Sequence, residues 1–443
     1  MKDREKAAAG QTGRFSESAA GRVLAGQPGI QDWQLDLYRE LHRHPELGHH
    51  EIRTAAAAAE ALRGAGFEVH AKIGTTGVVG ILRNGDGPVV LMRADMDALP
   101  MEEETGLPYA STDHAVDEAG NWVPVAHSCG HDAHVVCLLG AARLLAAETQ
   151  AWHGTFIALF QPAEELANGA RKMLDGGLSG VIPKPDVALA QHVLAFPAGR
   201  VGVRSGPFLT SADSLRITVH GRGSHGSMPQ LSVDPVVLAA MIVVRLQTVV
   251  AREVAPGEFA VVTVGMLSSG TKSNIISDHA VLDLNSRTVS NESRSRVLAA
   301  IERIVKAECM ASGSPRDPDF ELYDHYPLTQ NDASATVTVE EAFRRYFGAD
   351  TFTIGPQSAS EDFSRIPDAL GVPYVYWGIG GIDPELYAKA EASGKVSSEV
   401  PANHSPRFAP VPGPTLATGT AAIVVATLAW TGAGYLERAS STA

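Results

Sequence analysis

The chain has 443 residues, of which 44% are hydrophobic, so its length and composition allow two or three globular domains. A formal net charge of -14 and the lack of a basic cluster argue against nucleic acid as a partner and favour small molecules. Three cysteines, Cys129, Cys137 and Cys309, are too few for a disulfide framework, which indicates a reducing compartment and hence the cytoplasm.

The two ends of the chain carry no targeting pattern. The first thirty residues are polar and rich in Ala, Gly and Ser, and we expect a frayed extension there instead of a signal peptide. Residues 421–430 are strongly apolar but too short to span a bilayer. They therefore predict a buried helix packed on a sheet, and no membrane segment is expected.

Helix and strand patterns alternate along the N-terminal half. Helices are expected over 32–46 and 54–66, and strands over 67–70, 88–95, 154–160 and 186–193. This alternation is typical of an α/β fold with a mostly parallel sheet and helices on both faces. His42 and His44, at the end of the first helix, are expected to form a solvated or capping cluster and not a metal site.

A potential metal-binding segment, residues 128–134, stands just before a long apolar helix pattern. Cys129 and His131 are two residues apart at a strand-to-helix junction, and a thiolate and an imidazole are common metal ligands. Taken alone, a buried thiol beside a histidine satisfied by the backbone is the better interpretation. His192, which ends a strand pattern, and His404 add two further candidate ligands downstream.

Two adjacent carboxylates, Glu164 and Glu165, follow the strand pattern of residues 154–160 after a proline. Amide hydrolysis at a metal site needs one carboxylate to hold the cation and another to move a proton from the activated water to the leaving amine. Consecutive residues on an irregular turn can point in different directions. We therefore assign Glu165 as a ligand and Glu164 as the general base.

These candidates share a position in the predicted sheet, because functional groups of α/β folds gather beyond the carboxyl ends of the strands. Their number exceeds the four ligands that one tetrahedral ion needs, so two divalent cations are expected. The predicted metal ligands are Cys129, His131, Glu165, His192 and His404.

The pattern changes near residue 211. A half-exposed strand, a long helix from 234, strands near 259–267 and 279–288, a helix over 292–310 and a strand over 319–326 follow in turn. This β-α-β-β-α-β order predicts a ferredoxin-like α+β domain, residues 211–328, inserted into a catalytic domain formed by residues 30–210 and 329–435.

With these residues in view, the chain resembles the metallo-aminoacylase and carboxypeptidase superfamily, in particular its amidohydrolase branch of hippurate hydrolases and indole-acetyl-amino-acid hydrolases. The resemblance covers roughly residues 30–435. It rests on the motifs at 41–47, 93–100, 129–132, 161–165, 225–229, 274–276 and 360–363, and on His404.

The resemblance implies a two-metal centre with Cys129 as a bridging thiolate. It also implies that Asp97 orients a metal-bound histidine. The inserted domain would act as a lid and dimerisation module, in which His225 stabilises the oxyanion, often in the partner subunit. Asn274 and Arg287 would bind the oxyanion or the substrate carboxylate, although a surface salt bridge is an equal alternative for Arg287.

The sequence therefore predicts a cytoplasmic, homodimeric, binuclear metal-dependent amidohydrolase that acts on N-acyl amino acids or related conjugates. Its ions would be zinc, manganese, cobalt or nickel. A dipeptidase or carboxypeptidase with the same centre is one alternative. A non-catalytic small-molecule-binding protein on this fold is another, but such a protein would not need the general base Glu164.

Overall fold

The computed structural model describes residues 18–432, which divide into two units. Unit 2 comprises Leu209–Thr329 and Pro356–Glu361, and unit 1 comprises the remaining described residues. Unit 1 is therefore discontinuous in sequence. The short segment Pro356–Glu361, which the sequence pattern assigns to the catalytic domain, groups with unit 2.

An eight-stranded, mostly parallel sheet lies at the centre of unit 1. Its strand order is β1-β2-β6-β3-β7-β18-β8-β17. Parallel pairs join β6 to β3, β3 to β7, β7 to β18 and β8 to β17, whereas β1–β2, β2–β6 and β18–β8 are antiparallel. The strands are β1 Glu68–Ile73, β2 Gly77–Asn84, β3 Val89–Asp95, β6 Gly154–Gln161, β7 Val187–Pro197, β8 Val201–Val203, β17 Thr351–Thr353 and β18 Tyr374–Ile382.

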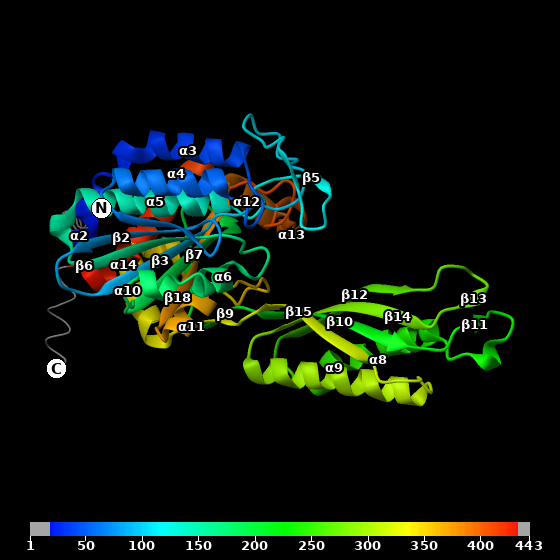
Figure 1. Ribbon diagram of the computed structural model, residues 1–443. Coiled ribbons are helices and arrows are strands. Elements are labelled where there is room, and N and C mark those ends of the chain that lie inside the picture. Colours follow the sequence, from blue (N-terminus) through cyan, green and yellow to red (C-terminus); the bar gives the residue numbers. More distant parts are fainter. Residues whose placement is uncertain (1–17, 433–443) are drawn as a thin grey trace. The chain divides into compact units, whose positions relative to one another are not determined.

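Helices cover this sheet, and Figure 1 shows α3, α4 and α5 above it, with α6 and α11 below. Contacts run from α4 to α5, from α5 to α14 and from α14 to α10, and α3 packs outside on α5 and α14. Helix α5 is apolar on nearly every side and correspondingly buried. The bounds are α3 Gln31–Arg43, α4 Ile52–Gly64, α5 His131–Ala147, α6 Gly169–Asp175, α10 Ala333–Phe347, α11 Arg365–Leu370 and α14 Pro412–Thr431.

Residues 18–30 form the helix α2 (Ala19–Leu24) and a 3₁₀ turn, which corrects for this part the expectation of a frayed extension over the first thirty residues. Ser18 caps the helix α2 by accepting the Gly21 N–H, and Val23 and Leu24 lie in the main hydrophobic core. Residues 1–17 lie outside the described part. The smaller elements of unit 1 are η1 Gln27–Ile30, β4 His114–Val116, β5 Trp122–Pro124, η2 Thr149–Ala151, α7 Leu178–Val181, η4 Gly348–Asp350, α12 Pro384–Ala392 and α13 Val396–Glu399.

Unit 2 has the β-α-β-β-α-β order that the sequence predicts. Its antiparallel sheet has the strand order β12-β14-β10-β15, and α8 and α9 pack on this sheet around a core of their own (Figure 1). The bounds are β10 Ser211–His220, α8 Pro235–Glu253, β12 Ala260–Ser269, β14 His279–Thr288, α9 Asn291–Ala311 and β15 Asp319–Tyr326. Short segments β11 Ser224–His225, η3 Pro229–Leu231 and β13 Ile275–Ile276 lie in loops of unit 2, whereas β9 Gly206–Leu209 and β16 Thr329–Asn331 lie where the chain enters and leaves this unit.

Within residues 18–432, two helices, α8 and α14, are long and apolar enough to cross a membrane by length and composition. This corrects the expectation that the apolar stretch near 421–430 is too short, because α14 begins nine residues earlier, at Pro412. Buried core helices pass the same test, and 78% of the apolar window of α14 is buried inside the structure. In α8, only 33% of the corresponding apolar window is buried.

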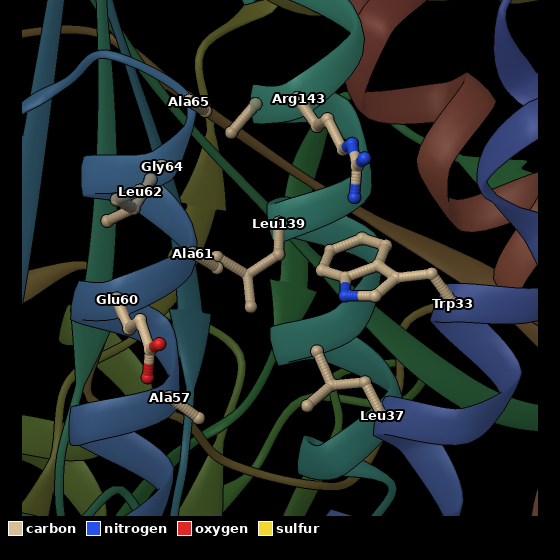
Figure 2. Close-up of a pocket in the computed structure, with 11 residues that line it drawn as sticks. Trp33, Leu37, Ala57, Glu60, Ala61, Leu62, Gly64, Ala65, Leu139 and Arg143 are labelled. Atoms are coloured by element: carbon tan, nitrogen blue, oxygen red, sulfur yellow. The ribbon is translucent and has the colours of Figure 1, made fainter.

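A groove of about 460 Å³ opens between α3, α4 and α5 (Figure 2). Leu37, Ala61 and Leu139 line it, and the Arg143 guanidinium stacks over the Trp33 ring at 5.0 Å from the ring centroid. None of its lining residues is a predicted site residue. The candidate chemistry therefore lies elsewhere, beyond the ends of the strands.

Candidate metal centre

The predicted ligands of unit 1 come from four places in the fold. Glu165 follows β6, His192 lies within β7, Cys129 and His131 flank the start of α5, and His404 lies in the loop before α14. Gly130 has a φ of +87° between Cys129 and His131, a backbone conformation that glycine adopts readily. The helix can therefore begin at His131, two residues after the cysteine.

Cys129, Glu165 and His404 form one cluster, in which the potential ligand atoms all lie within 4.8 Å of one another. His404 Nε2 is 3.2 Å from Glu165 Oε1. The His404 backbone, held at a φ of +66°, donates its N–H to the Ser128 carbonyl at 2.8 Å. Hydrogen bonding to Cys129 and Glu165 raises the pKa of His404 to about 10, so this pocket attracts positive charge.

His131 is fully buried beside the two adjacent carboxylates. Its Nε2 lies 3.9 Å from Glu165 Oε1 and 4.0 Å from Glu164 Oε2, while its Nδ1 lies 3.3 Å from Asp97 Oδ1. The other oxygen of Asp97 accepts the backbone N–H of Glu165 at 3.0 Å. Asp97 thus contacts both a candidate histidine ligand and the turn that carries the candidate carboxylate ligand.

His192 approaches the thiol from β7, with its Nε2 3.4 Å from Cys129 Sγ. Its Nδ1 donates to the Val193 carbonyl at 2.7 Å, which leaves the lone pair of Nε2 directed toward the sulfur. Burial, together with the neighbouring His134, holds the pKa of His192 well below its usual value. The neutral imidazole is the form that binds a metal.

The buried polar atoms of this region fit divalent cations. Within residues 18–432, neither ring nitrogen of the fully buried His131 has a well-directed hydrogen-bond partner. Such orphaned groups are rare in protein interiors unless an ion or a water satisfies them. A thiolate, imidazoles and a carboxylate are also the ligand types that zinc and similar ions prefer.

His134 is a supporting residue that the sequence argument did not assign. Its ring lies 4.5 Å from that of His192, its Nε2 accepts the Val193 N–H at 2.8 Å, and its Nδ1 lies 2.5 Å from Asp95 Oδ1. With both nitrogens engaged, His134 orients the His192 segment and does not bind a metal itself. A signal for it exists, since residues three apart share a helix face and His134 follows His131 by three.

Asn403 is a second such residue. Its side-chain amide donates to the carbonyls of Cys129 at 3.1 Å and Val193 at 3.0 Å. It therefore ties the loop before His404 to two of the other ligand segments. The sequence offers no signal for this role beyond the position of Asn403 next to a candidate ligand.

The expectation that His42 is solvated is wrong. Its side chain is 1% exposed, with Nδ1 2.6 Å from Asp132 Oδ2 and Nε2 3.1 Å from Glu103 Oε1. Burial alone would lower the pKa of His42, but the hydrogen bonds to Asp132 and Glu103 outweigh it and raise this pKa to about 9. His44, in contrast, is partly exposed and lies 2.9 Å from Asp113.

The three remaining predicted residues belong to unit 2. His225 pairs with Ile275 across the short β11–β13 ladder, so it lies next to Asn274. Arg287, on β14, donates to the Ser358 carbonyl at 2.8 Å and to Ser360 Oγ at 3.1 Å, and it makes no ion pair within the described residues. The roles of His225, Asn274 and Arg287 toward a substrate stay predictions.

Comparison with known proteins gives the family. The model of "Peptidase family M20/M25/M40" matches residues 91–394. The chain belongs to this family. It is 37% identical over 358 residues to the hippurate hydrolase of Campylobacter jejuni, and 34% identical over 358 residues to an N-acetylcysteine deacetylase of Bacillus subtilis. Each of these alignments covers 79% of this chain and 89% of the relative.

A solved structure agrees with this M20 assignment. The Bacillus subtilis YXEP protein, described as a dinuclear metal binding peptidase from the M20 family, matches with a TM-score of 0.72 and 28% identity over 90% of this chain and 99% of that protein. These findings confirm the resemblance to the amidohydrolase branch. They also confirm the mixed α/β fold with its large, mostly parallel sheet, and they support a metal-dependent amidohydrolase.

Proposed function

We propose that this M20 protein hydrolyses the amide bond of N-acyl amino acids or related conjugates. The observation that carries the proposal is the convergence of Cys129, Glu165 and His404 beside the buried His131 and the half-buried His192. The named relatives, a hippurate hydrolase and an N-acetylcysteine deacetylase, support the same substrate class. The family membership supports a hydrolytic reaction.

We propose two divalent ions, zinc, manganese, cobalt or nickel, held by Cys129, His131, Glu165, His192 and His404. Five protein ligands exceed the need of one tetrahedral ion, and the Bacillus subtilis YXEP protein is described as a dinuclear metal binding peptidase. When bound, such ions would polarise the scissile carbonyl and make water acidic enough to attack near neutral pH. We propose that Asp97, 3.3 Å from His131 Nδ1, would hold that imidazole in place when the ions are bound.

Glu164 is the proposed general base. It is 6% exposed, and its Oε2 lies 4.0 Å from His131 Nε2, whereas Glu165 directs Oε1 toward His404. Glu165 Oε1 lies 3.9 Å from the same His131 nitrogen and 3.2 Å from His404 Nε2, so both carboxylates face His131 but only Glu165 also reaches His404. Glu164 takes a proton from the attacking water and delivers it to the nitrogen of the leaving amine.

His225 is the proposed donor to the oxyanion. Its Nδ1 accepts the backbone N–H of Ser227 at 3.1 Å, and an N–H group can only donate. The neutral imidazole therefore carries its hydrogen on Nε2, where it can stabilise the charge that develops on the substrate oxygen. Asn274 and Arg287 are proposed to bind the oxyanion or the substrate carboxylate.

We further propose that the protein is a homodimer joined through unit 2. Helix α8 exposes an apolar stripe with Val237, Met241 and Val244 at 58%, 52% and 67% exposure, a spacing that places the three on one face. Sedimentation of Val244→Glu should show a shift toward the monomer. Val337→Glu, a matched change at a valine that is 55% exposed on α10, should not change the assembly state.

We propose a reducing, cytoplasmic setting, because Cys129, Cys137 and Cys309 are all free and the thiolate of Cys129 is needed for the metal. We propose that the protein binds a small molecule and that it binds neither nucleic acid nor a membrane.

The function is tested by a hydrolysis screen of the chelated enzyme after refilling with zinc, manganese, cobalt or nickel. N-acyl amino acids should be cleaved faster than dipeptides of the same C-terminal residue. Preference for dipeptides with a free amine would instead support the peptidase alternative. Metal binding without hydrolysis of either class would support the non-catalytic alternative.

A further inference from the structure

Glu51 is a buried acidic residue that lies behind the turn carrying the two adjacent carboxylates. It is 0% exposed. Its Oε1 accepts the backbone N–H of Ala163 at 2.8 Å and that of His49 at 2.9 Å, and its Oε2 accepts the Thr76 hydroxyl at 2.5 Å. The Ala163 bond links residues that are 112 positions apart in the chain.

Ala163 immediately precedes Glu164, and its backbone is in an unusual conformation. Its φ is +48°, a left-handed value that costs a residue with a β-carbon about 1–2 kcal/mol. Such a conformation persists only where the surroundings enforce it. The hydrogen bond from the Ala163 N–H to Glu51 is part of that enforcement, and the direction of the following side chain depends on it.

Gly48 and His49, which precede Glu51 in the chain, contact the turn 162–169 as well. A β-carbon on Gly48 would lie 2.9 Å from Leu166 Cδ1 and 3.1 Å from the β-carbon of Ala163, so Gly48 packs closely against the turn. His49 Nε2 lies 2.7 Å from Asn168 Oδ1. The segment 48–51 therefore supports the turn at its start, middle and end.

We propose that Glu51 is a positioning residue, which fixes the backbone of the turn 162–169 and thereby directs Glu164 and Glu165 toward the metal ions. This inference rests on the proposed function for the roles of the two carboxylates. Burial and the charge of Asp97 raise the pKa of Glu51 to about 7. Burial and the nearby Asp97 destabilise the charged form of Glu51, so we expect this residue to be needed for the hydrogen bonds that hold the turn.

The test compares Glu51→Ala with Glu51→Gln in the full chain. Alanine leaves the buried Ala163 N–H without its acceptor, whereas the glutamine amide can accept that N–H and donate to the Thr76 hydroxyl. Metal affinity is measured by zinc competition against a chelating dye, and kcat and KM are measured on an N-acyl amino acid. Asp332→Ala is the matched control, because it removes a carboxylate that caps α10, a helix of unit 1 that carries no candidate ligand.

For Glu51→Ala we expect zinc affinity to weaken by about tenfold to a hundredfold, the usual effect of removing a group that orients a ligand. The kcat should fall by about a hundredfold with KM changed less than threefold. Glu51→Gln should recover most of both losses, and Asp332→Ala should retain wild-type zinc affinity. Near-normal zinc affinity and kcat in Glu51→Ala, or equal losses in Asp332→Ala, would overturn the proposal.

Should Glu51→Ala fail to fold, Gly48→Ala addresses the same turn from the neighbouring contact. It is expected to weaken zinc affinity while the circular dichroism spectrum is unchanged, and unaltered affinity would count against the proposal. If the wild-type protein cleaves no N-acyl amino acid, the proposed function fails. The zinc titration still decides whether Glu51 supports the metal centre.

Discussion

Cys129 Sγ lies 3.4 Å from Nε2 of His192, although 63 residues separate the two in the chain. One belongs to the junction before α5, and the other is on the central strand β7. A thiol and a neutral imidazole at this distance can bind the same ion. This relationship gives the first prediction.

Cys129→Ala should lower the bound metal, because the thiolate is a proposed ligand of the ions. Elemental analysis of the purified protein measures the loss. Cys137→Ala is a suitable control, since Cys137 is another buried thiol but belongs to the interior of α5 and burial raises its pKa to about 12. Equal metal contents in the two variants would remove Cys129 from the ligands.

The buried His42 should make the stability of the protein depend on pH. Its pKa is about 9 in the folded protein and about 6.5 in an unfolded chain, so the protonated form is favoured by folding. Its contribution, on the order of 3 kcal/mol, is present in full below pH 6.5 and is lost as the pH rises through 9.

The measurement is the difference in Tm between the metal-free wild type and metal-free His42→Gln from pH 6 to 10. The wild type should be the more stable at pH 6, and the difference should shrink between pH 7 and 9.5. A difference that is constant or that grows with pH would mean that His42 is not held as a cation by Asp132 and Glu103.

His225→Ala should lower kcat by about a hundredfold to a thousandfold, roughly 3 kcal/mol, with the metal content unchanged. The reason is the loss of one hydrogen-bond donor to the oxyanion. Ser227→Ala should have a smaller effect, because the backbone N–H of residue 227 still donates to His225 Nδ1 and the Nε2 donor remains.

Sharing of His225 between subunits can be tested by mixing His225→Ala with Glu164→Gln under conditions that exchange subunits. If His225 acts in trans, a mixed dimer has both lesions at one site and one intact site, so activity should reappear. If mass spectrometry verifies mixed dimers and these stay inactive, His225 does not act on the active site of the partner subunit.

The sequence predicted the alternating elements of unit 1 and the element order of unit 2 because both follow from local hydrophobic periodicity. The helix expected over 54–66 is α4, shifted by two residues at each end, and β7 begins one residue after the expected strand. The strand β2 was missed, and so was the antiparallel pairing of β1 and β2, because Gly77 and Gly80 weaken a strand pattern that is buried on both faces.

The residues that support the candidate site were harder to predict than the candidate ligands. Cysteine, histidine and paired carboxylates indicate a possible metal site by their residue type alone, without knowledge of which residues they contact in the fold. The burial of His42 depends on Asp132, which lies 90 positions away, and the contact of Glu51 with Ala163 spans 112 positions. Such pairings arise only when distant segments fold together, so a single sequence carries no local signal for them.

Glu164→Gln tests whether this metal centre hydrolyses amides with Glu164 as the base. The substitution keeps the size of the side chain but removes its capacity to accept a proton, while Glu165 and the histidines stay in place. The measurement is kcat on an N-acyl amino acid together with bound metal per chain. We expect unchanged metal and a kcat lower by about 10² to 10⁴; near-normal turnover in the metal-loaded variant would contradict the role of Glu164 as the base.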